Sequence, residues 1–223
     1  MVTNLQSCKT GDETGDRSRV VSKPKVFGAG FQKTGTTSLG AIFDALGYRT
    51  LSYGEFRHLA ERDSLEWSEI TELALQLAAD ADAAKDTPWP LLYKDLDAAF
   101  PGSKFIHVTR DTKAWLQSAV NDFQNYPNAI HRLIYGSDGP LGGYEGIWAD
   151  RYEAHNAEVS EYFKDRPNDY LHIRLEDGVT FEKVCAFLGE PLVGTGAPKA
   201  NTRGKKKLKT LWWKLQERMR GLR

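Results

Sequence analysis

A glycine-containing loop near the start of the chain most constrains how this sequence can fold. The loop occupies residues 28–39 and follows the short apolar segment Lys25-Val26-Phe27. Such segments are typical of buried parallel strands. Apolar residues then recur at helical spacing, at Leu39, Ile42, Phe43 and Leu46. The sequence therefore predicts a strand, a loop and a helix, as part of an α/β domain in which helices flank a central parallel sheet.

The same loop combines the groups with which proteins hold phosphate. Glycines at positions 28, 30 and 35 allow successive amide N–H groups to point at one anion. The start of the helix adds its unpaired amides and the positive end of its dipole. A tight turn without any ligand is the alternative, but it would give no role to the lysine and the three consecutive hydroxyls, which are Lys33, Thr36, Thr37 and Ser38.

The loop differs from the P-loop of nucleotide triphosphate-binding proteins, which reads G-x-x-x-x-G-K-[ST]. Gln32 stands in place of the second glycine, which is displaced to Gly35. The resulting run, Gln-Lys-Thr-Gly-Thr-Thr-Ser-Leu, resembles the 5′-phosphosulfate loop of sulfotransferases that use 3′-phosphoadenosine 5′-phosphosulfate (PAPS). This resemblance implies a P-loop-like nucleotide-binding fold and adenosine 3′,5′-bisphosphate (PAP) as a product. It assigns nucleotide contacts to Gln32, Lys33, Thr34, Gly35, Thr36, Thr37 and Ser38.

A second element, a strand over residues 104–109 that leads into a helix, supports the resemblance. Arg110 follows the strand, at the sheet edge where open parallel sheets bind ligands, so we expect it to face the same crevice as the loop. Sulfotransferases carry an arginine here and a serine eight positions later, and together these hold the 3′-phosphate. Arg110 and Ser118 have this spacing. Taken alone, Arg110 could form an ion pair with Asp111 or another acidic neighbour, and Ser118 could be a neutral helix position.

The resemblance spans about residues 25–202. At its carboxyl end, the run from Asn201 to Lys205 lies where many family members place a basic, glycine-containing loop over the 3′-phosphate. The match is loose, and it makes Arg203 a further candidate for a nucleotide contact.

The resemblance also implies catalytic roles. Lys33 would neutralise the charge that develops on the bridging oxygen as PAP departs, and no metal is expected. A second group must accept the proton of the acceptor hydroxyl. Cytosolic members use a histidine after a lysine and a threonine, and other branches use a carboxylate. Because this chain has Ala84-Lys85-Asp86-Thr87-Pro88 at that place, Asp86 is the candidate base. Asp86 or Thr87 before a proline is equally a standard helix start.

The rest of the chain is expected to surround the acceptor. Helices over residues 54–62 and 67–84 should cover the acceptor pocket, and residues 125–144 have the composition of a mobile lid. His107 is expected in the core or at the sheet edge. His155 is expected to pack within a helix over residues 148–163, with a role in the pocket as the alternative. The aromatic residues that could line the pocket or belong to the core are Tyr48, Tyr53, Trp89, Phe123 and Trp148.

Length and composition fit one globular domain, since the 223 residues are 40% hydrophobic and 27% charged. We expect a disordered polar leader over residues 1–24, the domain over 25–202 and a basic amphipathic helix over 203–223. Cys8 and Cys185 suggest no disulfide framework. Since no apolar run approaches the length of a membrane span, a cytoplasmic location is expected.

The net charge is zero but unevenly distributed. Residues 199–223 contain ten basic residues and one acidic residue, a charge of about +9. Apolar residues form one helical stripe there, made of Leu208, Leu211, Trp212, Leu215, Met219 and Leu222. The stripe could pack on the domain or contact a membrane surface. Nucleic-acid binding is a weaker alternative, because no known binding module is present.

Two other function classes stay open beside a sulfotransferase that acts on a small-molecule, sugar or lipid acceptor. A small nucleotide kinase would share the sheet and the phosphate loop, but it should need Mg²⁺ and a triphosphate-type loop. A non-catalytic nucleotide-binding or membrane-adaptor protein would keep the phosphate sites without a working base.

Overall fold

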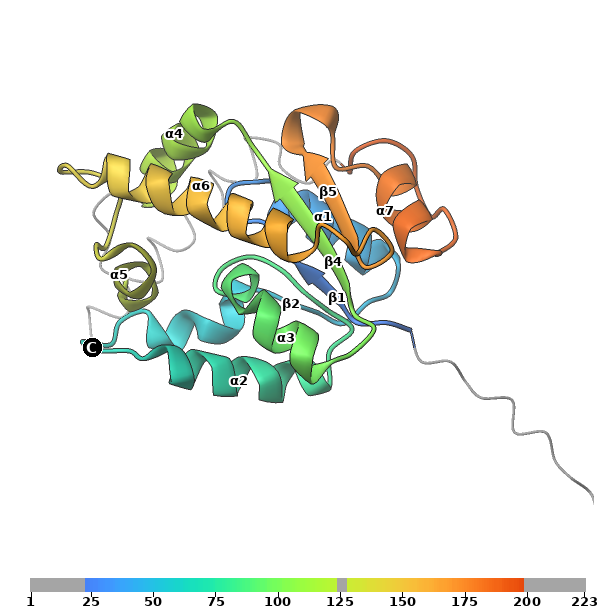
Figure 1. The fold of residues 1–223 in the computed structure, drawn as a ribbon, viewed down its shortest axis with the longest axis horizontal. Coiled ribbons are helices and arrows are strands. Elements are labelled where there is room, and N and C mark those ends of the chain that lie inside the picture. Colours follow the sequence, from blue (N-terminus) through green and yellow to red (C-terminus); the bar gives the residue numbers. More distant parts are fainter. Residues whose placement is uncertain (1–22, 124–127, 199–223) are drawn as a thin grey trace, which may run out of the picture.

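Five parallel strands form the centre of the structure, a computed structural model that describes residues 23–123 and 128–198. They lie in the order β2-β3-β1-β4-β5 (Figure 1). Phe27 of β1 pairs with Ala84 on one side and with Phe105 on the other, so β1 is the central strand. The expected α/β class with a parallel sheet is confirmed. The strands are β1 (Val26–Gly28), β2 (Thr50–Leu51), β3 (Ala83–Ala84), β4 (Lys104–Thr109) and β5 (Tyr170–Arg174).

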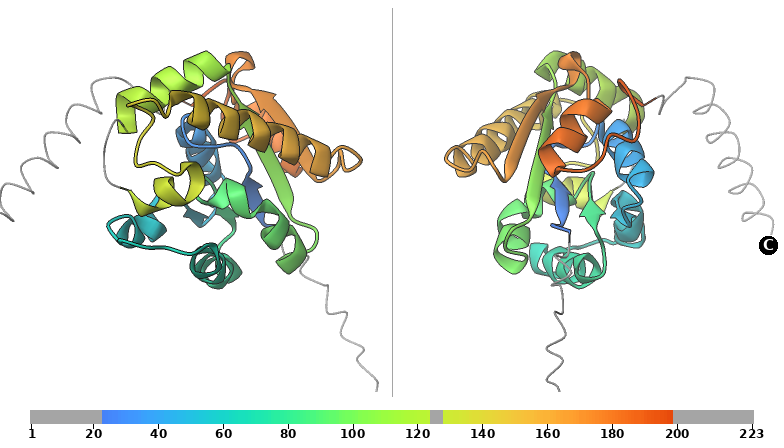
Figure 2. Two further views of the ribbon diagram at one scale, coloured as in Figure 1. Left: turned by 60° about the vertical axis from the view of Figure 1, so that its left-hand side comes forward. Right: turned by 90° about the vertical axis from the view of Figure 1, so that its right-hand side faces the viewer.

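Helices cover both faces of the sheet, because alternate strand residues point to opposite sides. Phe27 and Phe105 pack in one buried cluster with residues of α2, α3 and α6, whereas Val26 and Ile106 pack in another with residues of α1 and α7. Figure 2 (right) shows α1 and α7 on one side of the sheet and α3 and α6 on the other. The helical elements are α1 (Thr36–Ala45), η1 (Tyr53–Leu59), α2 (Trp67–Ala79), η2 (Trp89–Leu92), α3 (Tyr93–Ala99), α4 (Thr112–Phe123), α5 (Ala129–Tyr135), α6 (Glu145–Tyr162), η3 (Leu175–Asp177) and α7 (Phe181–Leu188).

The expected helix over residues 67–84 is wrong at its carboxyl end. The helix α2 stops at Ala79, and Ala83–Ala84 form the strand β3. Alanine favours helices, but this segment lies between β1 and β2 and takes up their backbone hydrogen bonds. The Val26 amide donates to the Asp82 carbonyl at 2.9 Å, and the Lys85 amide donates to the Leu51 carbonyl at 3.1 Å. Pairing within the sheet therefore overrides local propensity.

Other boundaries differ less. The strand over residues 104–109 is confirmed as expected, and the first strand is shifted by one residue to Val26–Gly28. In place of a helix over residues 54–62, the chain forms the 3₁₀ helix η1, which begins one residue earlier and ends at Leu59. The Glu55 carboxylate accepts from the Ser52 amide at 2.7 Å and fixes that start. The helix expected over residues 148–163 begins at Glu145.

Gly30 lies where the backbone after β1 passes close to Val108 of β4. A β-carbon there would collide with the Val108 carbonyl oxygen and lie 2.9 Å from the Val108 nitrogen. We expect Gly30→Ala to lower the free energy of unfolding by about 3 kcal/mol or more, because neither backbone atom can move away. Gly146, in α6, has open space where the methyl group of an alanine would lie. Gly146→Ala is the matched control and should stabilise by up to about 1 kcal/mol. Urea unfolding of both variants tests the contrast, and equal effects would contradict it.

Two histidines are sealed in the core. His107 and His155 are each 0% exposed, as their apolar neighbours predicted. His107 contacts the Tyr170 hydroxyl at 2.7 Å and the Asn156 side-chain oxygen at 3.0 Å, and Nε2 of His155 donates to the Ala29 carbonyl at 2.8 Å. Burial lowers the pKa of His107 to about 4 and that of His155 to about 3.

These lowered pKa values predict loss of stability in acid. The unfolded chain binds protons at its histidines below pH about 6.5, whereas the folded chain resists protonation until about 4. The free energy of unfolding should therefore fall as the pH is lowered from about 6.5 to about 4, by up to about 1.4 kcal/mol per pH unit for each histidine. Urea unfolding at pH 7, 6 and 5 measures this slope. His58→Ala, at an exposed position of η1, should leave the slope unchanged, and a flat profile would contradict the prediction.

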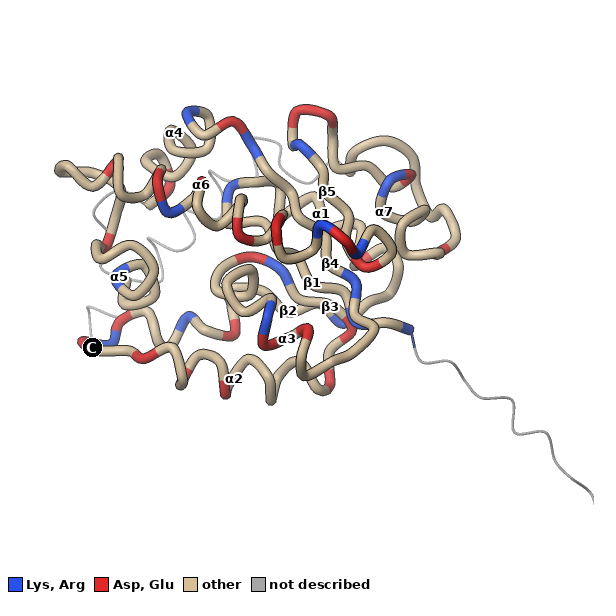
Figure 3. The backbone as a smooth tube through the Cα atoms, in the orientation of Figure 1, with Lys and Arg blue, Asp and Glu red and all other residues tan. Residues whose placement is uncertain are grey.

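Several expectations fall on residues outside the described part of the chain. These include nearly all of the polar leader, the basic helix over residues 203–223, Arg203 and Cys8, all of which stay predictions. Within the described ranges, acidic and basic residues are interspersed (Figure 3), and none of the helices has the length and apolar character that a membrane span requires.

Candidate active site

A cavity of about 540 Å³ opens at the carboxyl ends of the central strands. The loop after β1, the segment after β3 and Arg110 after β4 all line it. This is the edge at which parallel α/β sheets bind ligands, and the volume lies in the usual range for small-molecule sites. The remaining lining residues come from η1 and the turn after it, from α4 and from the start of α5, and they are Tyr53, Arg57, Ala60, Glu61, Ser118, Asp122, Phe123, Asn128 and His131.

The loop between β1 and α1 forms one wall of the cavity. Gly35 precedes the first residue of α1 and has a φ of 98°, which favours glycine. Most of the predicted nucleotide contacts in this loop do border the cavity, and these are Gln32, Lys33, Gly35, Thr36, Thr37 and Ser38. Thr34 is different, because it is fully buried and its hydroxyl donates to the Phe31 carbonyl at 2.6 Å. Its side chain therefore holds the loop in shape.

Gln32 connects the loop to two other parts of the site. Its side-chain NH₂ donates to the Tyr135 hydroxyl of α5 at 2.7 Å, and its side-chain oxygen accepts from the Thr87 hydroxyl. Its backbone carbonyl accepts from the Trp115 indole at 2.9 Å. The side chain of Gln32 is thus engaged with the protein, and its contact with a nucleotide stays a prediction.

Lys33 forms an ion pair with Asp122. The two side chains are 18% and 30% exposed, so the pair lies in the cavity wall rather than in open solvent. Lys33 has a φ of 70°, which residues other than glycine rarely adopt. The sequence reasoning missed Asp122. The available signal was its position one helical turn after Ser118, which places both residues on one face of α4.

Arg110 borders the cavity, and its guanidinium donates a long hydrogen bond to the Lys33 carbonyl at 3.5 Å. Its amide donates to the Tyr152 hydroxyl at 2.8 Å, and this hydroxyl donates to the Arg110 carbonyl at 2.9 Å. The Tyr152 ring stacks on Trp115 with centroids 4.2 Å apart. The alternative pairing with Asp111 is not observed, since Arg110 has no ion pair within residues 23–123 and 128–198. The Asp111 carboxylate instead accepts from the Ala114 amide at 2.9 Å.

Asp86 lies on the cavity wall after β3, near Lys33. Its φ is 74°, and its carboxylate accepts from the Thr87 amide at 2.9 Å. Its side chain does not cap the following helix, which begins at Trp89. Burial raises the pKa of the Asp86 carboxyl, while the charges of Lys85 and Lys33 and the hydrogen bonds from Thr87 and Thr36 act in the opposite direction. The net effect is a carboxylate that binds a proton more readily than an exposed aspartate.

The aromatic candidates divide into two groups. Tyr53 and Phe123 border the cavity. His155 does not border it; its ring stacks on Phe31 with centroids 4.2 Å apart. The remaining candidates are buried in the core, and these are Tyr48, Trp89 and Trp148. His131, which sequence reasoning had only placed in the lid region, borders the cavity from α5.

Solved structures to which this chain is similar include two sulfotransferases. One is from Alicyclobacillus acidocaldarius (16% identity, 91% of this chain and 96% of that chain, TM-score 0.45). The other is mouse sulfotransferase SULT7A1 complexed with PAP (18% identity, 76% and 59%, TM-score 0.43). A gluconokinase from Sinorhizobium meliloti 1021 is similar over 64% of this chain and 97% of that chain (13% identity, TM-score 0.35). With TM-scores below 0.5, these likenesses carry no further conclusion.

The family match is more extensive. A family model described as "Sulfotransferase domain" matches residues 25–138 and 122–206, which together make up most of the chain. No curated protein matches significantly. The matched residues include the loop after β1, Asp86, Arg110 and Ser118, which also meet at the cavity. The chain therefore belongs to the sulfotransferase domain family and is a transferase.

Proposed function

We propose that this protein transfers the sulfuryl group of PAPS to a hydroxyl or amine of a small acceptor and releases PAP. One observation carries the proposal: the loop after β1, Arg110 and Ser118 face one cavity, together with a partly buried carboxylate, Asp86. These groups match the chemistry of a donor with two separate phosphate positions.

The two ends of the donor would meet different elements. The amides of the loop, the start of α1 and the hydroxyls of Thr36, Thr37 and Ser38 are suited to the 5′-phosphosulfate. Arg110, which has no ion-pair partner in the described part of the chain, and Ser118 are suited to the 3′-phosphate. Arg203 remains a further candidate for that phosphate.

The chemistry then needs few groups from the protein. The acceptor oxygen attacks sulfur in line with the bond to the 5′-phosphate, and that bond breaks with its electron pair going to the bridging oxygen. Lys33 neutralises the charge that develops on this oxygen. Asp86 accepts the proton that the acceptor hydroxyl loses. No step in this scheme uses a metal.

Thermal unfolding with PAP, compared with ATP and Mg²⁺, tests the donor. A ligand at 100 times its dissociation constant should stabilise the folded state by about 2.7 kcal/mol. Selective stabilisation by PAP would support the proposal. Stabilisation by ATP with Mg²⁺ alone would favour the kinase, and PAP binding without turnover of any acceptor would favour a non-catalytic nucleotide-binding protein.

Arg110→Ala tests the 3′-phosphate position. We expect PAP affinity to fall by about 10- to 100-fold, because a charge-assisted hydrogen bond is worth roughly 1.5–3 kcal/mol. The affinity for 5′-AMP, which lacks the 3′-phosphate, should change much less. Arg174→Ala is the control, since Arg174 is an exposed arginine at the end of the neighbouring strand β5. Calorimetric titration of the wild type and both variants with each ligand measures these affinities, and equal losses for PAP and 5′-AMP in Arg110→Ala would contradict a contact with the 3′-phosphate.

A further inference from the structure

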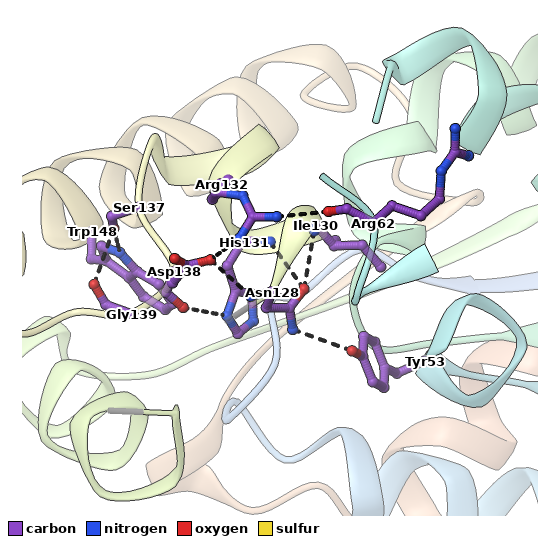
Figure 4. A network of polar contacts seen from close by, with 10 residues as sticks. All are labelled: Tyr53, Arg62, Asn128, Ile130, His131, Arg132, Ser137, Asp138, Gly139 and Trp148. Atoms are coloured by element: carbon purple, nitrogen blue, oxygen red, sulfur yellow. Dashed lines mark hydrogen bonds and ion pairs between the residues drawn. The ribbon is translucent and has the colours of Figure 1, made fainter. Parts of the chain in front are cut away.

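One wall of the cavity is built from η1, the turn after it and the start of α5. The Ala129 amide donates to the Ala60 carbonyl at 2.7 Å, and the Arg132 guanidinium donates to the Arg62 carbonyl at 2.7 Å. Tyr53 accepts from the Asn128 side chain at 3.2 Å (Figure 4). This wall is mostly polar, because its lining residues are Tyr53, Arg57, Ala60, Glu61, Asn128 and His131.

His131 is the most buried titratable group of this wall, with 5% of its surface exposed. Its ring meets Phe123 and Trp148 edge to face, with centroids 4.8 Å and 5.1 Å apart. Nδ1 lies 3.0 Å from the Asp138 carbonyl oxygen. Because a carbonyl only accepts hydrogen bonds, Nδ1 carries the proton of the neutral ring, and Nε2 carries a lone pair.

The ring that carries this lone pair is part of the cavity wall. Nε2 has no hydrogen-bond partner within residues 23–123 and 128–198, and the ring borders the cavity. Among the described residues, Nδ1 of His155 is the one fully buried side-chain nitrogen or oxygen without a partner. Nε2 of His131 is therefore not sealed in the core. Burial lowers the pKa of His131 to about 4, so the ring stays neutral at neutral pH.

The position of His131 is fixed from two sides. The Asn128 side-chain oxygen accepts from the amides of Ile130 and His131 at 3.0 Å and 3.3 Å and so caps α5. An ion pair between Arg132 and Asp138 holds the loop that supplies the carbonyl for Nδ1 (Figure 4). The lone pair on Nε2 is therefore oriented before any ligand binds, as in sites that select one ligand.

We infer that the acceptor carries a second hydrogen-bond donor besides the group that is sulfated, and that Nε2 of His131 accepts from it. The substrate class is then a polyhydroxylated molecule, such as a sugar or polyol, rather than a plain alcohol or phenol. An acceptor with a single hydroxyl would exclude water from Nε2 without donating a hydrogen bond to it. Sites that are built to hydrogen-bond a hydroxyl reject analogues that lack this group. This inference depends on the proposed sulfuryl transfer.

Two matched acceptors test the substrate class with the full chain and saturating PAPS. Methyl β-D-glucopyranoside and cyclohexylmethanol both present a primary hydroxyl on a six-membered ring, but only the first has further hydroxyls. We expect kcat/KM to favour the glucoside by about tenfold or more. His131→Asn retains a donor for the Asp138 carbonyl and lacks Nε2, so it should raise the KM for the glucoside and bring the ratio to within about threefold. His58→Asn, on the exposed side of η1, should keep the wild-type ratio.

The outcomes separate the two proposals. A ratio near one in the wild type, turnover of 2-naphthol but not of the glucoside, or an unchanged ratio in His131→Asn would overturn the inference alone. A different pair of results would overturn the proposed sulfotransferase function itself. These are a lack of stabilisation by PAP, or no sulfation of the glucoside, cyclohexylmethanol or 2-naphthol. ¹⁵N NMR of histidine-labelled protein gives a test without turnover, because the inference requires the Nδ1-protonated tautomer of His131. Protonation at Nε2 would overturn it.

Discussion

Lys33→Ala is expected to lower the rate of sulfuryl transfer by about 100- to 1,000-fold while PAP still binds. The ammonium group acts on charge that appears at the bridging oxygen only as the bond to sulfur breaks. The loop amides, the start of α1 and Arg110 remain in place to hold the phosphates. The structure already keeps Lys33 at the cavity through its ion pair with Asp122. Single-turnover rates with PAPS, together with calorimetric titration of PAP, separate the effect on rate from the effect on binding.

Lys113→Ala is the matched control for this prediction. Lys113 lies on the exposed side of α4 and does not line the cavity, so its removal should leave both rate and affinity unchanged. A rate for Lys33→Ala within threefold of the wild type would exclude Lys33 from the chemistry. A loss of PAP affinity as large as the loss of rate would make Lys33 a binding residue only.

Asp86→Asn should lower turnover by about 100- to 10,000-fold and leave PAP affinity nearly unchanged. Asparagine keeps the shape of the side chain and an oxygen that can accept from the Thr87 amide, but it cannot take a proton from the acceptor. Stability should not fall. A carboxyl whose pKa is raised by burial binds its proton more tightly in the folded chain, so its ionised form costs stability at neutral pH. Activity assays and urea unfolding at pH 7 would show loss of turnover without loss of stability.

The pH profile gives a second test of Asp86. A base works only when it is deprotonated, so wild-type kcat/KM should fall as the pH drops through the raised pKa of Asp86 and level off above it. The residual activity of Asp86→Asn should lack this acidic limb. Asp95→Asn, at an exposed position of α3, should keep the wild-type profile. Full turnover in Asp86→Asn would place the base elsewhere.

Local sequence patterns were sufficient for much of the fold. The apolar segment before the loop, the helical spacing after it and the run over residues 104–109 each predicted an element that the structure contains. The rule that parallel strands bind ligands at their carboxyl ends then brought the loop and Arg110 to one cavity. The strand β3 could not be predicted in this way, because its two alanines become a strand only by pairing with β1 and β2.

The residues on the acceptor side of the cavity could not be predicted from the sequence for the same physical reason. Asp122 and His131 lie on helices, and only tertiary packing decides which helix face meets a cavity. The contacts that place His131 come from Asn128, Asp138 and Trp148, which are up to 17 positions away in the sequence. A sequence motif identified Asp86 as the candidate base. The pKa of its carboxyl, however, depends in part on residues from the loop and from α1.

The left-handed backbone at Lys33 and Asp86 has a consequence for protein engineering. A non-glycine residue in this conformation costs roughly 1–2 kcal/mol, which glycine does not incur. A selection for heat tolerance alone would therefore favour glycine at both positions. Such a selection would remove both the Lys33 ammonium and the Asp86 carboxylate. The resulting protein would be more stable but would lack the groups that the proposed chemistry needs. Directed evolution of this scaffold should hold these two positions constant.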